Sequence, residues 1–267
     1  MELFFREKGQ GEKNIIVVHG LYGSSDNWLS IAKSFESKYR IILVDQRNHG
    51  RSPHSPEHTY DAMSKDLYEL FTKLNLKKAI LLGHSMGGKT VMRFCLDYPE
   101  MIEKLVVLDI APKSYRSFSN YAEVTADHQK IVKELMSLNP SQYKDRREID
   151  QVLKKSFPSI ALRAFLMKNL KRDDNGQFFW QLNLEALKNN MNEIMDGFSQ
   201  LTPTNKKMPE TIFIRGEKSP YIHDEDILVI NKFFPGSQVV TIPEAGHWVH
   251  AEKPELFTKT VQYFIDD

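Results

Sequence analysis

The chain has 267 residues and a formal net charge of +1, from 36 Lys and Arg against 35 Asp and Glu. This length suits one α/β domain with an insertion, and the balanced charge argues against a protein that binds nucleic acid through a basic surface. Hydrophobic residues make up 41% of the chain, which is enough for a core and excludes global disorder.

The chain holds a single cysteine, Cys95, so it can form no internal disulfide bond and no zinc site built on cysteines. Such a composition suits a reducing compartment. The apolar run within residues 1–7 is far too short for a signal peptide, and no stretch approaches the about 18 apolar residues of a membrane span. We therefore expect a cytoplasmic protein without a membrane-spanning segment.

Short apolar runs rich in β-branched residues predict the strands of a sheet. In chain order they are Leu3–Arg6, Asn14–Val18, Arg40–Val44, Ala79–Leu82, Leu105–Leu108, Thr211–Ile214 and Ser237–Ile242. Most of these runs are apolar throughout, which is typical of strands buried on both faces of a mostly parallel sheet.

Helical patterns lie between these strands. The expected helices, with apolar residues spaced three and four apart, are Tyr60–Leu74, Met86–Tyr98, Asp224–Phe234 and Pro254–Ile265. The alternation of strands and helices predicts a doubly wound α/β sheet.

The alternation stops between residues 113 and 207. This segment contains no convincing strand, only helical stretches at Tyr121–Leu138, Arg147–Phe157, Ile160–Leu170 and Leu182–Met195. We interpret residues 1–112 and 208–267 as the core domain and residues 113–207 as a helical cap, or lid, inserted between two late strands. Ligands bind at the C-terminal edge of the strands in such sheets, so the cap is expected to lie over that edge.

The strongest functional signal is Gly83-His84-Ser85-Met86-Gly87, a run of the form G-x-S-x-G. It follows an apolar strand and precedes a helix, which is the context of a nucleophile elbow. A turn this sharp strains the serine backbone and lifts its Oγ clear of the sheet, and the two glycines avoid clashes there. We predict that Ser85 is a nucleophile.

A serine hydroxyl needs a general base to attack a carbonyl group. We expect the base in the loop after the last strand, where His247 stands; His250 is the competitor, but it lies closer to the final helix. His84 is expected to pack or hydrogen-bond locally. The histidines that we expect to be polar loop residues without a catalytic role are His49, His54, His58, His128 and His223.

The tetrahedral oxyanion of acyl transfer needs fixed hydrogen-bond donors. One candidate is the backbone N–H of Met86, the residue after the nucleophile. The other is the backbone N–H of Leu21, in a loop where Gly20 and Gly23 let the backbone bend toward the site. An ordinary glycine turn is the alternative interpretation of this loop.

Together these motifs resemble the α/β-hydrolase superfamily over essentially the whole chain. The resemblance rests on His19-Gly20-Leu21, on the run DQRNHGRS at residues 45–52, on the elbow and on Gly246-His247. Within the superfamily the chain is similar to the bacterial YbfF-type esterases, through Leu108-Asp109-Ile110-Ala111-Pro112 and through residues 180–187 and 213–222. The resemblance implies an α/β-hydrolase fold and ester hydrolysis at Ser85.

The third catalytic residue departs from the superfamily's usual pattern. An Asp commonly follows the strand that we place at Thr211–Ile214, but Ser219 stands there. An acid is still needed to orient the imidazole. The resemblance to YbfF-type esterases implies Asp109 in this role, with Asp224 and Glu217 as alternatives, while a turn-capping role is the structural alternative for Asp109.

We therefore expect a serine hydrolase that cleaves small-molecule carboxylic esters with short to medium acyl chains, with thioesters as a further substrate class. Tyr22, Trp180 and Trp248 are expected to contact the substrate, although packing explains such aromatic residues equally well. The alternatives are a lactonase, a carbon–carbon bond hydrolase, a cofactor-free haloperoxidase or a non-catalytic binding module of the same fold. The chain has no metal or nucleotide motif, so we expect no metal and no cofactor; it carries no signal for an oligomeric state.

Overall fold

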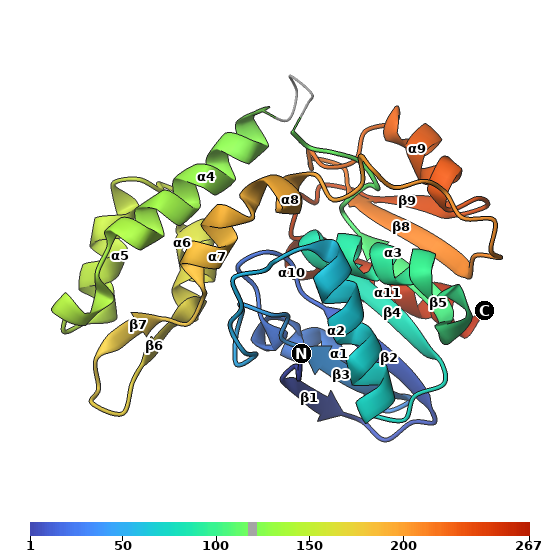
Figure 1. The fold of residues 1–267 in the computed structure, drawn as a ribbon, viewed down its shortest axis with the longest axis horizontal. Coiled ribbons are helices and arrows are strands. Elements are labelled where there is room, and N and C mark those ends of the chain that lie inside the picture. The colour runs from blue at the N-terminus through green and yellow to red at the C-terminus, as the bar shows by residue number, and fades with distance from the viewer. Residues whose placement is uncertain (117–121) are drawn as a thin grey trace.

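The computed structural model describes residues 1–116 and 122–267, with the side chains of residues 122–126 left out. The helix start predicted at Tyr121 therefore lies outside the described residues. A seven-stranded sheet forms the centre of the molecule (Figure 1). Its strands are β1 (Phe5–Lys8), β2 (Lys13–Val18), β3 (Tyr39–Val44), β4 (Ala79–His84), β5 (Ile102–Leu108), β8 (Glu210–Gly216) and β9 (Gln238–Ile242).

The strand order is β1-β3-β2-β4-β5-β8-β9, and β1 is antiparallel to β3 while the other neighbours are parallel. The predicted, mostly parallel α/β sheet is therefore confirmed. The sequence predicts the first strand at Leu3–Arg6, which is wrong, because β1 begins two residues later, at Phe5. It is a half-exposed edge strand, so its pairing with β3, in which Phe5 opposes Val44, sets its bounds rather than its own hydrophobic pattern.

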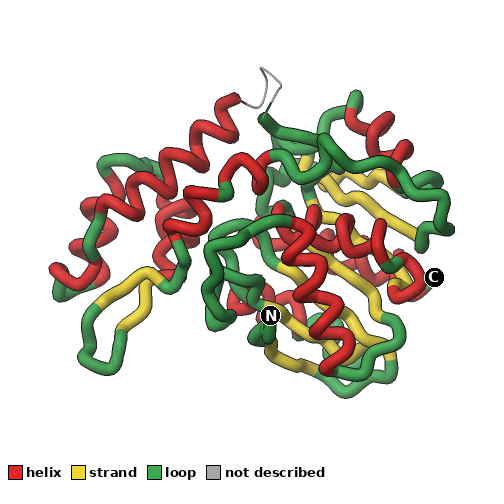
Figure 2. The backbone as a smooth tube through the Cα atoms, viewed as in Figure 1, coloured by secondary structure: helices red, strands yellow, loops and turns green. Residues whose placement is uncertain are grey.

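Helices cover both faces of the sheet (Figure 2). On one face α2 (Tyr60–Lys73), α3 (Met86–Asp97) and α9 (Asp226–Phe233) pack over one set of strand residues. On the other face α1 (Leu29–Ala32) and α11 (Pro254–Asp266) pack over the alternate set. Such burial stabilises the fold by roughly 1.5–3 kcal/mol for each large apolar side chain.

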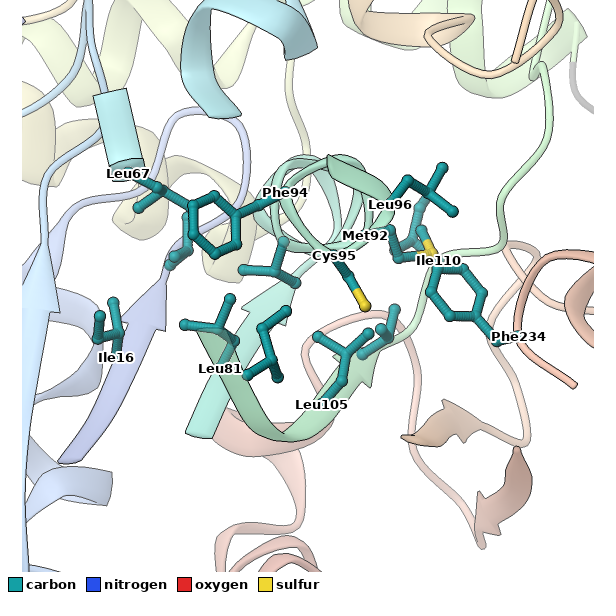
Figure 3. Packing of buried hydrophobic residues seen from close by; sticks show 14 of the residues in the cluster. Ile16, Leu67, Leu81, Met92, Phe94, Cys95, Leu96, Leu105, Ile110 and Phe234 are labelled. Carbon is teal, nitrogen blue, oxygen red and sulfur yellow. The ribbon is translucent and has the colours of Figure 1, made fainter. Parts of the chain in front are cut away.

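Alternation along each strand produces the two layers. In β2, Ile16 belongs to the cluster under α3, whereas Ile15 belongs to the cluster under α11. Figure 3 shows the first cluster, in which Leu81 and Leu105 of the sheet lie beneath Phe94 and neighbouring side chains of α3. The helix that follows Ser85 is thereby held against the centre of the sheet.

The segment at residues 113–207, called the insertion below, lies between β5 and β8 and extends to one side of the sheet (Figure 1). Its elements are α4 (Ala122–Ser137), α5 (Arg146–Lys154), α6 (Ile160–Leu166), β6 (Leu170–Arg172), β7 (Phe178–Trp180), α7 (Leu184–Asn189) and α8 (Met191–Met195). Its apolar residues, such as Leu135 and Leu187, form a hydrophobic cluster that also takes in Leu21, Tyr60 and Met86. The division into core and cap at residues 112 and 208 stays a prediction.

The expectation that the insertion holds no strand is wrong. β6 and β7 form an antiparallel hairpin, in which Leu170 opposes Trp180. The turn is closed by Asp173, whose Oδ1 accepts the N–H groups of Asn175 and Gln177, and by Gly176 at a φ of 76°. The strands are only three residues long, so no alternating pattern develops in the sequence, although the Asn-Gly pair is a hairpin signal.

The single helix predicted at Leu182–Met195 is also wrong, because the structure has α7 and α8 with a break at Asn190. The Asn190 amide donates to Ala186 O at 2.8 Å and to Pro56 O at 2.8 Å, so its side chain competes with the helical backbone bonds. Among the described residues, no helix is long and apolar enough to cross a membrane.

Candidate active site

Ser85 occupies the turn between β4 and α3. Its φ of 53° lies in the left-handed region, which is strained for a residue that has a Cβ. A Cβ on Gly83 would lie 2.3 Å from Gly87 O, and a Cβ on Gly87 would lie 2.3 Å from Val18 O, so both positions need glycine. The Ser85 N–H donates to Leu108 O at 2.9 Å. The structure thus has the sharp, glycine-flanked turn that the G-x-S-x-G run predicts.

His247 lies in the loop after β9, and its Nδ1 is 2.7 Å from Oδ2 of Asp109. Asp109 follows β5, has a φ of 54° and is fully buried. Its Oδ1 accepts the N–H of Gly216 at 3.0 Å, and its Oδ2 also accepts the hydroxyl of Ser219. A buried carboxylate needs such donors on both oxygens, and Ser219, which stands where an Asp is common in the superfamily, supplies one of them.

The two alternative acids lie elsewhere. Asp224 is exposed and pairs with Arg215 at 2.6 Å. Glu217 accepts the backbone N–H of Glu244 at 2.8 Å. Among the described contacts of His247, the carboxylate partner is therefore Asp109, and the structure does not bring Asp224 or Glu217 to the imidazole.

The other histidines near His247 are packed. The ring of His250 stacks on Trp28, with centroids 4.2 Å apart, and burial lowers the pKa of His250 to about 3. His84 donates from Nε2 to the backbone carbonyl of His247 at 2.9 Å. The loop itself is held by Glu252, which accepts backbone N–H groups on both sides of His247. His250 is therefore a packing residue, and His247 is the imidazole held against a carboxylate.

Ser85 and His247 line one cavity of about 70 Å³. Leu21, Tyr22 and Trp248, which the sequence suggests for this site, line it as well. The insertion contributes three apolar walls, from Ile131, Leu162 and Phe165. A second, smaller recess of about 20 Å³ also reaches Ser85, and Tyr60, Lys89 and Tyr115 are among the residues that line it.

Trp180 is not among the residues that line either recess. It belongs to β7 and packs against the hydrophobic cluster of the insertion. The structure therefore does not bring Trp180 to the site with Tyr22 and Trp248. Trp180 ends the aromatic run Phe178-Phe179-Trp180, and the buried residue of this run is Phe178.

The loop after β2 lies directly against the elbow. A Cβ on Gly20 would lie 2.9 Å from Nδ1 of His84 and 3.1 Å from the Cβ of Ser85, so any larger residue here would have to displace these neighbours. Tyr22 has a φ of 62° and donates its N–H to Nε2 of His49 at 3.2 Å. Among the hydrogen bonds of the described residues, none uses the backbone N–H of Leu21 or of Met86.

Two of the histidines that the sequence suggests as polar loop residues are instead fully buried. His49 supports the turn at Tyr22, and His58 lies against the sulfur of Met86 at 3.3 Å. Burial lowers the pKa of His58 to about 3. Local sequence carries no signal for this burial, because it depends on how two loops pack together. Among the described residues, no group of three or more His, Cys, Asp or Glu side chains is arranged to hold a metal ion.

The comparisons with known proteins bear on the family and the fold of the chain. A family model described as the alpha/beta hydrolase fold matches residues 13–254. The chain belongs to the α/β-hydrolase family. The predicted fold and the predicted membership are both confirmed.

Relatives in this family are similar over most of their length. The chain is 37% identical to the sn-1-specific diacylglycerol lipase ABHD11 of Danio rerio over 260 residues, which cover 96% of this chain and 80% of that protein. It is 31% identical to esterase YbfF of Escherichia coli K12 over 253 residues, covering 95% of this chain and 93% of that protein. A solved structure, a marine microorganism esterase, superposes with a TM-score of 0.93 at 41% identity, covering 98% of this chain and 99% of that one.

These findings also confirm the predicted enzyme class. The α/β-hydrolase relatives reported above are esterases and a lipase, and this chain is a carboxylic-ester hydrolase.

Proposed function

We propose that this hydrolase cleaves carboxylic esters through a triad of Ser85, His247 and Asp109. The observation that carries the proposal is the 2.7 Å contact between His247 Nδ1 and Asp109 Oδ2, with His247 and Ser85 on the walls of one cavity. The strained turn exposes the serine to that cavity while the carboxylate stays buried behind the imidazole. This is the order nucleophile, base and orienting acid that acyl transfer requires.

The reaction proceeds in two halves. Ser85 Oγ attacks the carbonyl carbon as His247 Nε2 accepts the hydroxyl proton, and the alcohol then leaves with that proton from His247. In the second half, water gives a proton to His247 and its oxygen attacks the acyl-enzyme, which releases the acid and restores Ser85. Asp109 accepts the Nδ1–H throughout, which keeps Nε2 available as the base and stabilises the imidazolium.

We place the oxyanion hole at the backbone N–H groups of Leu21 and Met86. Both residues border the second recess at Ser85, and Leu21 also borders the larger cavity. Support comes from the absence of partners for these two N–H groups among the described residues. Removing one such donor in other serine hydrolases costs about 10²–10³ in turnover.

We assign the insertion as a cap that forms the acyl pocket. Ile131, Leu162 and Phe165 would contact the acyl chain, together with Trp248 of the core. A cavity of about 70 Å³ suits short acyl groups such as acetyl and butyryl. The proposed substrates also include esters with medium acyl chains, and thioesters. Tyr22 would contact the substrate from the core side.

We also propose the cytoplasm as the site of action. Cys95 is a buried free thiol in the helix after the elbow, and burial raises its pKa well above the ordinary range. A chain that holds no disulfide suits a reducing compartment.

The decisive experiment compares wild type, Ser85→Ala and Ser30→Ala on 4-nitrophenyl acetate and 4-nitrophenyl butyrate. Ser30 is an exposed serine on α1, so its variant is the matched control. We expect Ser85→Ala to lose activity by about 10⁴-fold or more and Ser30→Ala to retain it. Equal residual rates in wild type and Ser85→Ala would overturn the proposed mechanism.

A further inference from the structure

His128, on α4 of the insertion, has one ring nitrogen bonded to protein and one without a partner. Its Nε2 lies 3.1 Å from the hydroxyl oxygen of Tyr221. Its Nδ1 is buried, and no described residue offers it a hydrogen bond. A buried polar atom in a native protein is nearly always hydrogen-bonded to protein, water or a ligand, so Nδ1 of His128 is available to a bound molecule.

The free nitrogen belongs to a side chain at the reaction centre. His128 lines both the larger cavity and the second recess, as do Ser85 and Leu21. Its backbone is anchored to the core, because the Tyr22 hydroxyl donates to His128 O at 3.2 Å. The ring therefore borders both of the recesses that reach Ser85.

Contacts of Tyr221 place His128 on the side of the leaving alcohol. The Tyr221 ring stacks on His247, with centroids 3.9 Å apart and planes 19° from parallel. The departing oxygen must receive its proton from His247, so the alcohol portion passes beside Tyr221. The Tyr221 hydroxyl is bonded to His128, which places the imidazole next to that portion of the substrate.

The imidazole offers a hydrogen bond without a charge. Burial, and then the nearby His247, lower the pKa of His128 to about 4. At pH 7 the ring is neutral, with one nitrogen a donor and the other an acceptor. The Tyr221 hydroxyl can itself donate or accept, so Nδ1 can adopt either role. A hydroxyl group, which also donates and accepts, matches such a partner better than a carboxylate or an ammonium group.

We propose that His128 is a positioning residue whose Nδ1 binds a free hydroxyl on the alcohol portion of the substrate. The preferred substrates are then partial esters of diols and polyols rather than esters of simple alcohols. This proposal rests on the proposed function of Ser85 and His247, and it adds the chemistry of the leaving group.

The test uses two esters that share an acyl group, 2-hydroxyethyl butyrate and ethyl butyrate, with released acid measured by pH-stat titration. We expect wild type to favour the hydroxyethyl ester in kcat/KM by about 3- to 10-fold, the range for one neutral hydrogen bond. His128→Leu is expected to lose this preference, and His128→Asn, whose amide can still donate and accept, to recover part of it.

Two further variants separate positioning from packing. Tyr221→Phe keeps the ring over His247 but removes the hydroxyl that holds His128, so the preference is expected to fall while both esters are still cleaved. Gln129→Leu, at the next and exposed position of α4, is the control with an unchanged preference. Thermal melting of each variant shows whether it is folded. If His128→Leu does not fold, Tyr221→Phe provides the test.

A wild-type enzyme that cleaves both esters equally well would overturn the role of His128 while the proposed function stands. The same holds if His128→Leu slows both esters by the same factor, because a purely structural role has that effect. Failure of wild type to cleave either ester would instead overturn the proposed function and this proposal with it.

Discussion

The sheet and the insertion contribute different things to the site. The sheet positions the three residues of the proposed triad: Ser85 follows β4, Asp109 follows β5 and His247 follows β9, all at the C-terminal ends of the strands. The insertion provides cavity walls, among them Phe165 and His128. Backbone pairing between strands fixes the positions of Ser85, Asp109 and His247. Side-chain packing between the insertion and the sheet region fixes the positions of the cavity walls. Changes in the sheet should therefore alter the reaction, and changes in the insertion should alter the choice of substrate.

Hydrogen bonds between side chains and backbone join the two regions. The Tyr60 hydroxyl donates to Ile194 O at 2.7 Å, and Lys89 Nζ donates to Met195 O at 3.1 Å. Lys89 is buried beneath aromatic rings, and burial lowers its pKa to about 7. These bonds hold the end of α8 against α2 and α3, so the insertion is tied to the helix that follows Ser85.

The largest effect is expected at Asp109. Asp109→Asn removes the charge that stabilises the imidazolium and permits the wrong tautomer of His247, so kcat is expected to fall by about 10⁴-fold with little loss of stability. Steady-state kinetics on 4-nitrophenyl butyrate, with a thermal melt, measures both quantities.

Asp224→Asn is the matched control, because it makes the same chemical change at an exposed carboxylate that pairs with Arg215. Its activity is expected to stay near that of wild type. Near-normal activity in Asp109→Asn, together with a loss of activity in Asp224→Asn, would contradict the assignment of Asp109. It would show that Asp224 is the acid that orients the imidazole.

A matched pair of leucines sharpens the comparison of the two regions. Leu105 is fully buried in the sheet and Leu187 is fully buried in the insertion. Because the insertion's cluster includes Tyr60 and Met86 of the core, we expect one cooperative unfolding transition. Leu105→Ala and Leu187→Ala should each lower the free energy of unfolding by about 2–5 kcal/mol.

Urea unfolding followed by circular dichroism measures these changes. Leu228→Ala, at a leucine that is 79% exposed, is the control and should change the free energy by less than about 0.5 kcal/mol. A separate early transition in Leu187→Ala would show instead that the insertion unfolds on its own.

The strands and the elbow could be predicted from sequence because their causes are local. Continuous apolar runs such as Ile41-Ile42-Leu43-Val44 indicate buried strands, and the glycines around Ser85 indicate the sharp turn. The proximity of Asp109 and His247 was less accessible, since it depends on the order of β5, β8 and β9 in the sheet. The resemblance to known esterases supplied that step.

Long-range packing explains what the sequence did not reveal. The burial of His58 and the position of His128 depend on contacts between segments far apart in the chain, such as the 93 residues that separate His128 from Tyr221. Trp180 shows the converse, because a prominent aromatic residue of the insertion packs against the insertion's hydrophobic cluster and not in the site. The hairpin of β6 and β7 is too short for periodicity to indicate.

The smallest expected effect concerns acid stability. The pKa of His250 in the folded chain is about 3, below the about 6.5 of an unfolded histidine. Between these values the unfolded chain binds a proton that the folded chain does not, so this residue lowers stability as the pH falls, by about 1.4 kcal/mol per pH unit. His250→Phe, which keeps a ring against Trp28, is expected to show a shallower loss between pH 6 and pH 4. Urea unfolding at several pH values measures the slope, and an unchanged slope would contradict the burial of His250 as a neutral ring.

The claim that Ser85 is activated by His247 is tested most directly by covalent labelling with a fluorophosphonate, followed by mass spectrometry of the peptides. A single adduct on Ser85 is predicted in the wild-type enzyme, with labelling slowed sharply in His247→Ala. No adduct on Ser85, or labelling at the same rate in His247→Ala, would contradict it.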